Sequence, residues 1–331
     1  MSDLDTHPEV VACRSSSTAD QTLTARKVWL GRTTEVERVL PDRTVRMIGA
    51  WCFLDHYGPQ DVSDGPGMQV WAHPHTGLQT VSYLLDGEIE HRDSVGSHAM
   101  VRPGELHVMT AGRGIVHSEL SLAEHPPRLH GLQLWVALPD HARSVPPSFD
   151  SYAALPPLAA PGVTGQVVIG TLAGVSAPAS GHTPLCAADL RLAPATTYRL
   201  PLDPSFEYGV LVVAGSASVD DHDLAVDQLR YTEPGRTAVT VVTEPGCRLL
   251  VIGGEPFAEE IVMWWNFVGR SHEEVAAYRQ EWLARADRFP AVVSRGEKVL
   301  EAPMMPNVTL RPRPRRTDLG RADLRADRDP R

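Results

Sequence analysis

The chain has 331 residues, of which 42% are hydrophobic and 22% are charged, so it is long and apolar enough for two globular domains. Its formal net charge of −10 at pH 7 argues against non-specific binding to nucleic acid phosphates. No apolar run has the length of a membrane span, and the four cysteines form no Cys-x-x-Cys pair, so we expect no membrane contact, reduced cysteines and a cytoplasmic location.

The first half of the chain consists of short apolar runs separated by turn residues. Polar residues without periodicity occupy positions 1–22, which we expect to be disordered. The runs between residues 23 and 140 are typical of β-strands, and Asp86-Gly87 is the signal of a hairpin turn between two of them. This pattern predicts one antiparallel β-barrel over residues 23–140. Residues 141–164 are rich in Pro and Ala and predict a linker.

The second half repeats the pattern of short strands over residues 165–290 and predicts a second antiparallel barrel. It contains no His-x-His, and His182 and His222 have no carboxylate partner at a matching spacing, so we expect no metal ion there. A capping box that begins at Ser271 predicts a short C-terminal helix in an otherwise all-β protein. Residues 291–331 are expected to form an extended, disordered tail rich in Arg, Pro and Asp, with a polyanion-binding arm as the alternative.

Two short segments of the first half carry metal-ligating residue types at a spacing of two. One contains His73 and His75, and the other contains His117 and Glu119. Residues i and i+2 of a strand point to the same side, so both side chains of each pair can point into a barrel. Two such pairs could meet at one ion. Three imidazoles and a carboxylate suit a first-row divalent ion such as Fe, Mn, Co, Ni, Cu or Zn.

The spacing of these residues resembles the two motifs of the cupins. A glycine stands six positions before His73, and another stands three positions before His117. Ordinary cupins have a carboxylate separated from the second histidine by three or four residues, where this chain has Gln79 and Thr80. Glu119 supplies a carboxylate instead, and that substitution is the mark of the pirin family. The segments that carry the resemblance to pirins are HPHTGLQTVSYLLDGEIEHRDSVG, VMTAGRGIVHSE and HGLQLWVALP.

The resemblance to pirins covers about residues 25–290 and has consequences for fold and function. It implies a bicupin, with two barrels of jelly-roll type, one metal ion in the first barrel only, and a C-terminal segment that packs back on that barrel. Fe(II) is the expected ion. Some pirins resemble quercetin 2,3-dioxygenases, in which a metal-bound flavonol is cleaved by O2. Others resemble non-enzymatic regulators, in which an iron centre is a redox switch for binding a transcription factor or a metabolic enzyme.

We expect the dioxygenase, because the site leaves coordination positions open and has a base nearby, and we keep the redox-sensing regulator as the alternative. The expected partners are a flavonol and O2, or a protein in the regulatory case, with no direct binding of nucleic acid, and we expect a monomer. Glu119 is either a plain ligand or also the group that takes a proton from the substrate. His107 stands where pirins commonly have Gln, and it either hydrogen-bonds a ligand or the substrate or is a barrel residue without such a role. His91 and His56 are expected to be structural.

Overall fold

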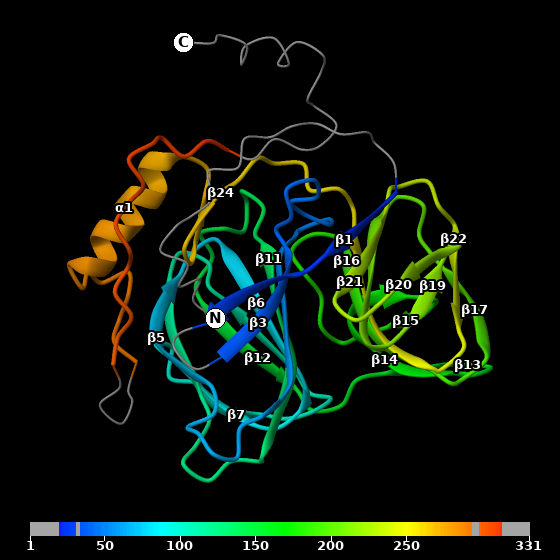
Figure 1. Ribbon diagram of the computed structural model, residues 1–331. Helices are drawn as coiled ribbons and strands as arrows, with labels where there is room; N and C mark the ends of the chain where they lie inside the picture. Colours follow the sequence, from blue (N-terminus) through cyan, green and yellow to red (C-terminus); the bar gives the residue numbers. More distant parts are fainter. Residues whose placement is uncertain (1–19, 31–33, 293–297, 313–331) are drawn as a thin grey trace, which may run out of the picture.

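The structure is a computed structural model that describes residues 20–30, 34–292 and 298–312. Two β-sandwiches lie side by side (Figure 1). The larger sheet of the first domain contains, in spatial order, β12 (Ser148–Tyr152), β9 (Leu106–Thr110), β6 (Leu78–Asp86), β11 (Arg128–Ala137), β4 (Trp51–Asp61), β3 (Thr34–Leu40) and β2 (Arg26–Leu30). Its smaller sheet contains β5 (Gln69–His75), β10 (Ile115–Leu120), β7 (Ile89–Asp93) and β8 (His98–Val101).

The second domain repeats this arrangement. Its larger sheet contains β1 (Gln21–Thr24), β21 (Gln228–Thr232), β18 (Glu207–Gly215), β23 (Cys247–Gly254), β16 (Leu185–Leu192), β14 (Val163–Leu172) and β13 (Pro157–Ala160), with β15 (Val175–Ser176) paired to β14. Its smaller sheet contains β17 (Thr196–Pro201), β22 (Ala238–Thr243), β19 (Ala217–Val219) and β20 (His222–Leu224). In both small sheets the first strand along the chain lies at one edge and is followed by the fourth, the second and the third. The predicted all-β fold of two antiparallel jelly rolls is confirmed.

The interiors of the two sandwiches differ in chemistry. In the second domain, β17 and β22 of the small sheet turn Leu200, Val239 and Val241 inward, and these side chains join a buried apolar cluster with Val210 and Val212. The corresponding strands of the first domain, β5 and β10, carry the histidines and Glu119. Apolar side chains therefore fill the space that a polar site occupies in the first domain.

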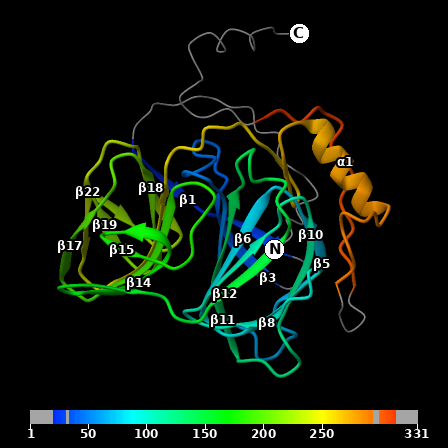
Figure 2. The same cartoon turned by 180° about the vertical axis from the view of Figure 1, so that it is seen from behind.

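Each end of the chain packs on the domain that is farther from it in the sequence. Near the N-terminus, β1 pairs with β21 of the second domain, from Gln21 opposite Tyr231 to Thr24 opposite Gln228. Near the C-terminus, the hairpin of β24 (Val262–Trp264) and β25 (Phe267–Gly269) and the helix α1 (His272–Leu283) return to the first domain. Figure 2 shows α1 beside β5 and β10, on the side of the first domain away from the second.

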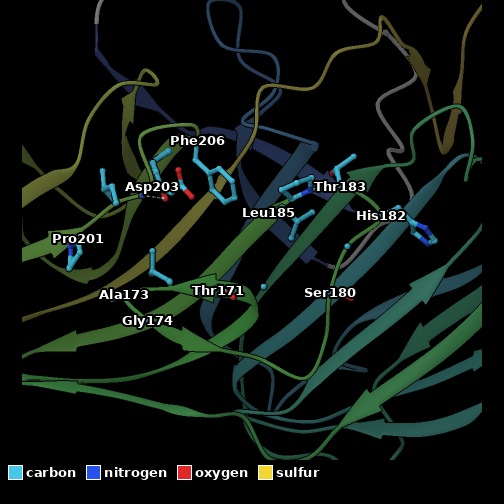
Figure 3. A pocket seen from close by; sticks show the side chains of 16 residues that line it. Thr171, Ala173, Gly174, Ser180, His182, Thr183, Leu185, Pro201, Asp203 and Phe206 are labelled. Atoms are coloured by element: carbon cyan, nitrogen blue, oxygen red, sulfur yellow. Dashed lines mark hydrogen bonds between the residues drawn. The ribbon is translucent and has the colours of Figure 1, made fainter.

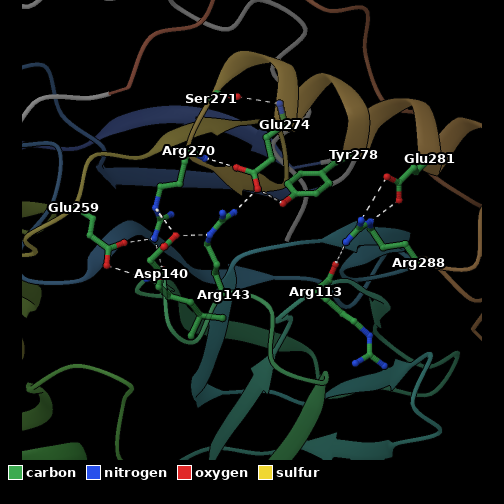
Figure 4. Close-up of polar contacts among 11 residues, drawn as sticks. Arg113, Asp140, Arg143, Glu259, Arg270, Ser271, Glu274, Tyr278, Glu281 and Arg288 are labelled. Carbon is green, nitrogen blue, oxygen red and sulfur yellow. Dashed lines mark hydrogen bonds and ion pairs between the residues drawn. The ribbon is translucent and has the colours of Figure 1, made fainter.

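Charged side chains attach this C-terminal segment to the first domain (Figure 4). Arg143 forms an ion pair with Glu274 of α1, and its Nε donates to Asp140 at 2.7 Å. Arg270 pairs with Glu259 and donates to the carbonyl oxygen of Leu138 at 2.8 Å. The Ser271 part of the predicted capping box is present, since the Ser271 hydroxyl accepts from the Glu274 backbone N–H at 3.2 Å, whereas the Glu274 carboxylate accepts from the backbone N–H of Arg270 at 2.6 Å. Among the residues that the structure describes, no helix is long and apolar enough to cross a membrane.

Three predicted boundaries are wrong. The disordered N-terminus, 1–22, extends too far, because β1 begins at Gln21; residues 1–19 lie outside the described part of the chain. The linker 141–164 contains β12, which pairs with β9 of the first domain, and β13, which pairs with β14 of the second. The tail 291–331 begins too early, because the Leu300 backbone N–H donates to Ala72 at 2.9 Å and Ala302 is buried. Residues 293–297 and 313–331 are outside the described ranges.

Polar and apolar contacts fix the two domains against each other. One apolar cluster contains buried side chains from both domains, including Leu134 of β11 and Ile252 of β23. The Tyr83 hydroxyl donates to Asp189 at 2.9 Å, and the same carboxylate accepts two bonds from Arg248, at 2.8 and 2.7 Å. A planar guanidinium that meets a carboxylate in this paired way fixes both groups in direction. The first domain therefore has a rigid support for its large sheet.

Candidate metal centre

Three of the predicted ligands meet at one point inside the first domain. In β5, His73 and His75 point to the same side, and antiparallel pairing places His117 of β10 directly opposite His73. The ring centroids are 4.9 Å apart for His73 and His75, 4.4 Å for His73 and His117, and 5.0 Å for His75 and His117. One potential ligand atom of each residue lies within 4.8 Å of those of the other two.

The state of these three imidazoles fits a bound metal ion. Each side chain is 0% exposed, and the Nε2 atoms are buried with no hydrogen-bond partner within the described ranges. An unpartnered buried nitrogen is costly, so three that converge indicate a missing common partner. Burial lowers the pKa of His73, His75 and His117 well below the ordinary value. The rings are therefore neutral at physiological pH, and a neutral imidazole is the form that binds a metal ion.

The other ring nitrogen of each histidine is in contact with a different part of the chain. The Nδ1 of His73 donates to the carbonyl oxygen of Trp71 at 2.7 Å, and that of His75 donates to the carbonyl oxygen of Asn266 at 3.1 Å. The Nδ1 of His117 faces the Nδ1 of His91 at 3.5 Å. A carbonyl oxygen accepts only, so the first two rings carry their proton on Nδ1 and leave Nε2 as a lone-pair donor.

Glu119 is fully buried near these rings but does not belong to the same compact group. The pairing of β10 with β5 shifts register between His117 and Glu119, which indicates a β-bulge. A bulge redirects the side chains that follow it. Ligand atoms of Glu119, His117 and His91 form a second group within 4.8 Å. Its Oε1 accepts from the hydroxyl of Ser82 at 3.1 Å. The bulge thus places the predicted carboxylate at one edge of the three imidazoles.

The remaining predicted residues lie in different surroundings. His107 is buried on β9, and its Nε2 is 3.3 Å from the carboxylate of Glu105, which is not one of the four predicted ligands. His56 contacts Asp227 at 2.5 Å and His130 at 2.8 Å, and Asp227 belongs to the second domain. Both residues have polar partners of their own. His107 keeps a buried Nδ1 without a partner in the described part of the chain, so it retains the capacity to bind a further group.

Sequence reasoning missed the position of His91. It lies on β7, whose residues pair with β10, so that Glu119 is opposite His91 and His117 is opposite Asp93. A signal for this was available, because His91 and Asp93 have the same i, i+2 spacing as the ligand pairs. The spacing predicts that both side chains point to one face, which is the face that carries the site.

Apolar side chains close the site on another side. The indole of Trp135 lies 5.1 Å from the ring of His75 in an edge-on arrangement and stacks on Phe53 at 4.1 Å. Both aromatic residues are almost fully buried. A dry, low-dielectric surrounding strengthens the interaction of an ion with its ligands and with any charged substrate group.

A cavity of about 670 Å³ lies in the second domain (Figure 3). Gly170 to Gly174 form one wall, Ser180 to Leu185 form a second, and Asp203 and Phe206 lie on a third. None of the predicted metal ligands lines it. His182 does, but within the described ranges no second metal-ligating histidine or acidic residue joins it in a group that could hold an ion. The cavity does not belong to the candidate metal centre.

Two family profiles match the chain, one for each domain. The profile described as pirin matches residues 33–136, and the one described as the pirin C-terminal cupin domain matches residues 187–290. Together they cover more than half of the chain. The chain is a member of the pirin family. Pirins are metal-binding cupins, and the cluster of histidines and Glu119 is the group in this pirin that could hold the ion.

Two of the proteins that this pirin resembles are named for one activity, and a third is named for the family alone. A protein from Pseudomonas aeruginosa named "Putative quercetin 2,3-dioxygenase" is 44% identical over 86% of this chain and 90% of its own length. Human pirin is 32% identical over 62% of this chain and 72% of its own. A crystal structure of a quercetin 2,3-dioxygenase from Acinetobacter baumannii superposes with a TM-score of 0.86 at 39% identity, over 89% of this chain and 98% of that one.

Proposed function

We propose that this pirin is a metal-dependent dioxygenase that cleaves a flavonol such as quercetin with O2. The observation that carries the proposal is the convergence of three buried, unpartnered Nε2 atoms beside a buried carboxylate. His73, His75 and His117 would hold the ion with Glu119, and Fe(II) is the proposed ion. Four protein ligands leave two positions of a six-coordinate ion open, whereas a structural site is normally closed. The names of the relatives support the choice of substrate.

The bound ion would supply acidity to a flavonol hydroxyl and a binding position for O2. The protein would supply the base. Glu119 is the carboxylate two residues after His117, and its Oε1 accepts a hydrogen bond from Ser82. General bases of this kind act within hydrogen-bond reach of the proton that they take.

The neighbours of Glu119 hold its carboxylate in place. The Ser82 hydroxyl is 3.1 Å from Glu119 Oε1 and also 2.9 Å from Gln133 Oε1. A Gln amide can turn either its oxygen or its NH2 group toward a neighbour, so Gln133 can donate to Ser82 while Ser82 donates to Glu119. Ser82 and Gln133 thus orient the carboxylate of Glu119.

One observation favours a second candidate function, the non-enzymatic iron-binding regulator. His73, His75, His117 and Glu119 are each 0% exposed, so a flavonol has to displace covering residues before it reaches them. A redox sensor needs only electron transfer and a change in binding to a protein partner. The same four residues would serve both functions.

The deciding experiment is aerobic turnover. The protein loaded with Fe(II) should bleach the flavonol absorption of quercetin and release CO, and His75→Ala should abolish both. Loss of the metal from His75→Ala, measured by elemental analysis, is the matching control. No bleaching by a fully loaded wild-type protein would overturn the dioxygenase. Redox-dependent binding of a protein partner would then support the regulator.

A further inference from the structure

Two polar side chains that the proposed function does not use lie directly behind His117. His91 and Asp93 are on β7, are both 3% exposed and have no role in the predicted ligand set. The strand pairing places Asp93 opposite His117. The Nδ1 atoms of His73 and His75 contact backbone carbonyl oxygens, whereas the Nδ1 of His117 contacts a side chain, that of His91.

Asp93 is held in one orientation. Its Oδ1 accepts from the backbone N–H groups of Val95 at 3.0 Å and of Ser97 at 2.9 Å. Its Oδ2 is 3.1 Å from Nε2 of His91, and the carboxylate side chain is fully buried. A carboxylate accepts only, so Nε2 of His91 carries the proton. Asp93 therefore selects one tautomer of His91.

That tautomer presents an acceptor to His117. In a neutral imidazole with its proton on Nε2, Nδ1 has a lone pair. The Nδ1 of His91 is 3.5 Å from the Nδ1 of His117, which is longer than the usual hydrogen bond of about 2.7–3.2 Å but close enough for a weak one. The ring of His91 also stacks on Phe149 at 4.3 Å with an angle of 17°, so its plane is fixed. Each contact in the row His117–His91–Asp93 then has one donor and one acceptor.

We propose that His91 and Asp93 are positioning residues for the metal centre: Asp93 fixes the tautomer of His91, and His91 accepts the Nδ1 proton of His117, which leaves Nε2 of His117 free to bind the ion. This inference rests on the proposed metal site, but not on the proposed reaction. Partners of this kind orient a metal-binding histidine and typically change metal affinity by about 10- to 100-fold when they are removed.

The test compares two substitutions of His91 that separate hydrogen bonding from packing. His91→Phe keeps a ring that can stack on Phe149 but has no acceptor. His91→Asn loses the stacking, while its amide oxygen can take the place of Nδ1. We expect His91→Phe to weaken Co(II) binding by about 10- to 100-fold, and His91→Asn to remain close to the wild type. The dissociation constant is measured by competition with a chromophoric chelator, without substrate.

Asp93→Asn provides a second, nearly isosteric variant. Its amide oxygen would still accept from Val95 and Ser97, so its NH2 group would face Nε2 of His91 and force the proton of His91 onto Nδ1. Two N–H groups would then oppose each other between His91 and His117. We expect a loss of Co(II) affinity similar to that of His91→Phe, and a double variant no weaker than either single one, because both changes break the same row.

The matched control is His98→Phe on the neighbouring strand β8, where His98 is exposed and bonded to Glu90. It should bind Co(II) like the wild type. The proposal is overturned if His91→Phe and Asp93→Asn both keep wild-type affinity, or if His91→Asn binds as weakly as His91→Phe, since packing would then explain the loss. Because no substrate is present, an absence of quercetin turnover leaves this result unaffected.

Discussion

His75 and Asn266 are 191 positions apart in the sequence, and the Nδ1 of His75 donates to the carbonyl oxygen of Asn266 at 3.1 Å. Asn266 lies at the turn between β24 and β25, so a segment that follows the entire second domain orients a histidine of the first. The backbone of the same hairpin is bonded to the residue that follows β5, because the N–H of Val268 donates to the carbonyl oxygen of Thr76 at 3.0 Å. The return of the C-terminal segment to the first domain therefore helps to orient a histidine of the candidate metal centre.

A substitution of Gly77 should disturb this contact. Gly77 has a φ of +68°, and a Cβ there would lie 2.2 Å from the carbonyl oxygen of Val268. Gly77→Ala must therefore displace the hairpin that carries Asn266, and we expect weaker metal binding together with lower stability. The measurements are the Co(II) dissociation constant and the melting temperature.

The matched control for Gly77→Ala is Gly215→Ala in the second domain. Gly215 has a φ of +75°, and its added Cβ would lie 2.2 Å from the carbonyl oxygen of Gly246. Both variants should lose stability, by about 1–2 kcal/mol from the left-handed backbone alone. Only Gly77→Ala should lose metal affinity. Equal affinity in the two variants would show that the hairpin does not orient His75.

Two truncations should separate the packed part of the C-terminal segment from the rest. Residues 298–310 contact the first domain and α1: Leu300 donates to Ala72 at 2.9 Å, and its carbonyl accepts from the indole N–H of Trp282 at 3.0 Å. Deleting 298–331 should lower the melting temperature, because buried apolar area and these bonds are lost. Deleting only 311–331 should change neither melting temperature nor metal content. A fall of several degrees in the shorter deletion would contradict this division.

Features that depend on a few consecutive residues could be predicted from the sequence, whereas contacts between residues far apart in the chain could not. The placement of His73 and His75 on one side of their strand could be predicted because alternation along a strand is a property of a few consecutive residues. The capping box at Ser271 is equally local. The bond from His75 to Asn266 could not be predicted, because the acceptor is a backbone carbonyl, which every residue possesses. The pairing of β1 with β21 also had no local signal, since it depends on which sheet edge the folded chain leaves open.

The stability of the metal-free protein should fall as the pH decreases from about 6.5 to 4, in part through His130. Burial, with additional repulsion from His56 and Arg248, lowers the pKa of His130 to about 4. The imidazole is protonated near pH 6.5 in the unfolded chain and only near pH 4 in the folded protein. Between these two values the unfolded state therefore binds more protons than the folded state. The stabilising contribution is complete above pH 6.5 and is lost as the pH falls toward 4.

His130→Asn isolates that contribution. The free energy of unfolding of the metal-free protein is measured by urea denaturation between pH 4 and pH 8, for the wild type and the variant. The difference between the two should be constant above pH 7 and should shrink between pH 6.5 and pH 4, because only the wild type loses stability through this group. Parallel curves over the full range would contradict the assignment to His130.

Glu119→Gln should separate metal binding from chemistry. Gln keeps the shape of the side chain and one oxygen donor but loses the negative charge and the basicity. His73, His75 and His117 should still hold the ion, about 10- to 100-fold more weakly, which corresponds to about 1.4–2.8 kcal/mol. If Glu119 is also the proton acceptor, quercetin turnover at full metal loading should fall by a further ~10²- to 10⁴-fold.

The comparison for Glu119→Gln has to be made at equal metal occupancy, because weaker binding alone also lowers turnover. Ser82→Ala is the matched variant: it leaves the carboxylate in place and removes its hydrogen-bonded neighbour. It should lower turnover less than Glu119→Gln, since the basic group is still present. Equal rates for the wild type and Glu119→Gln at matched occupancy would show that Glu119 is a ligand only.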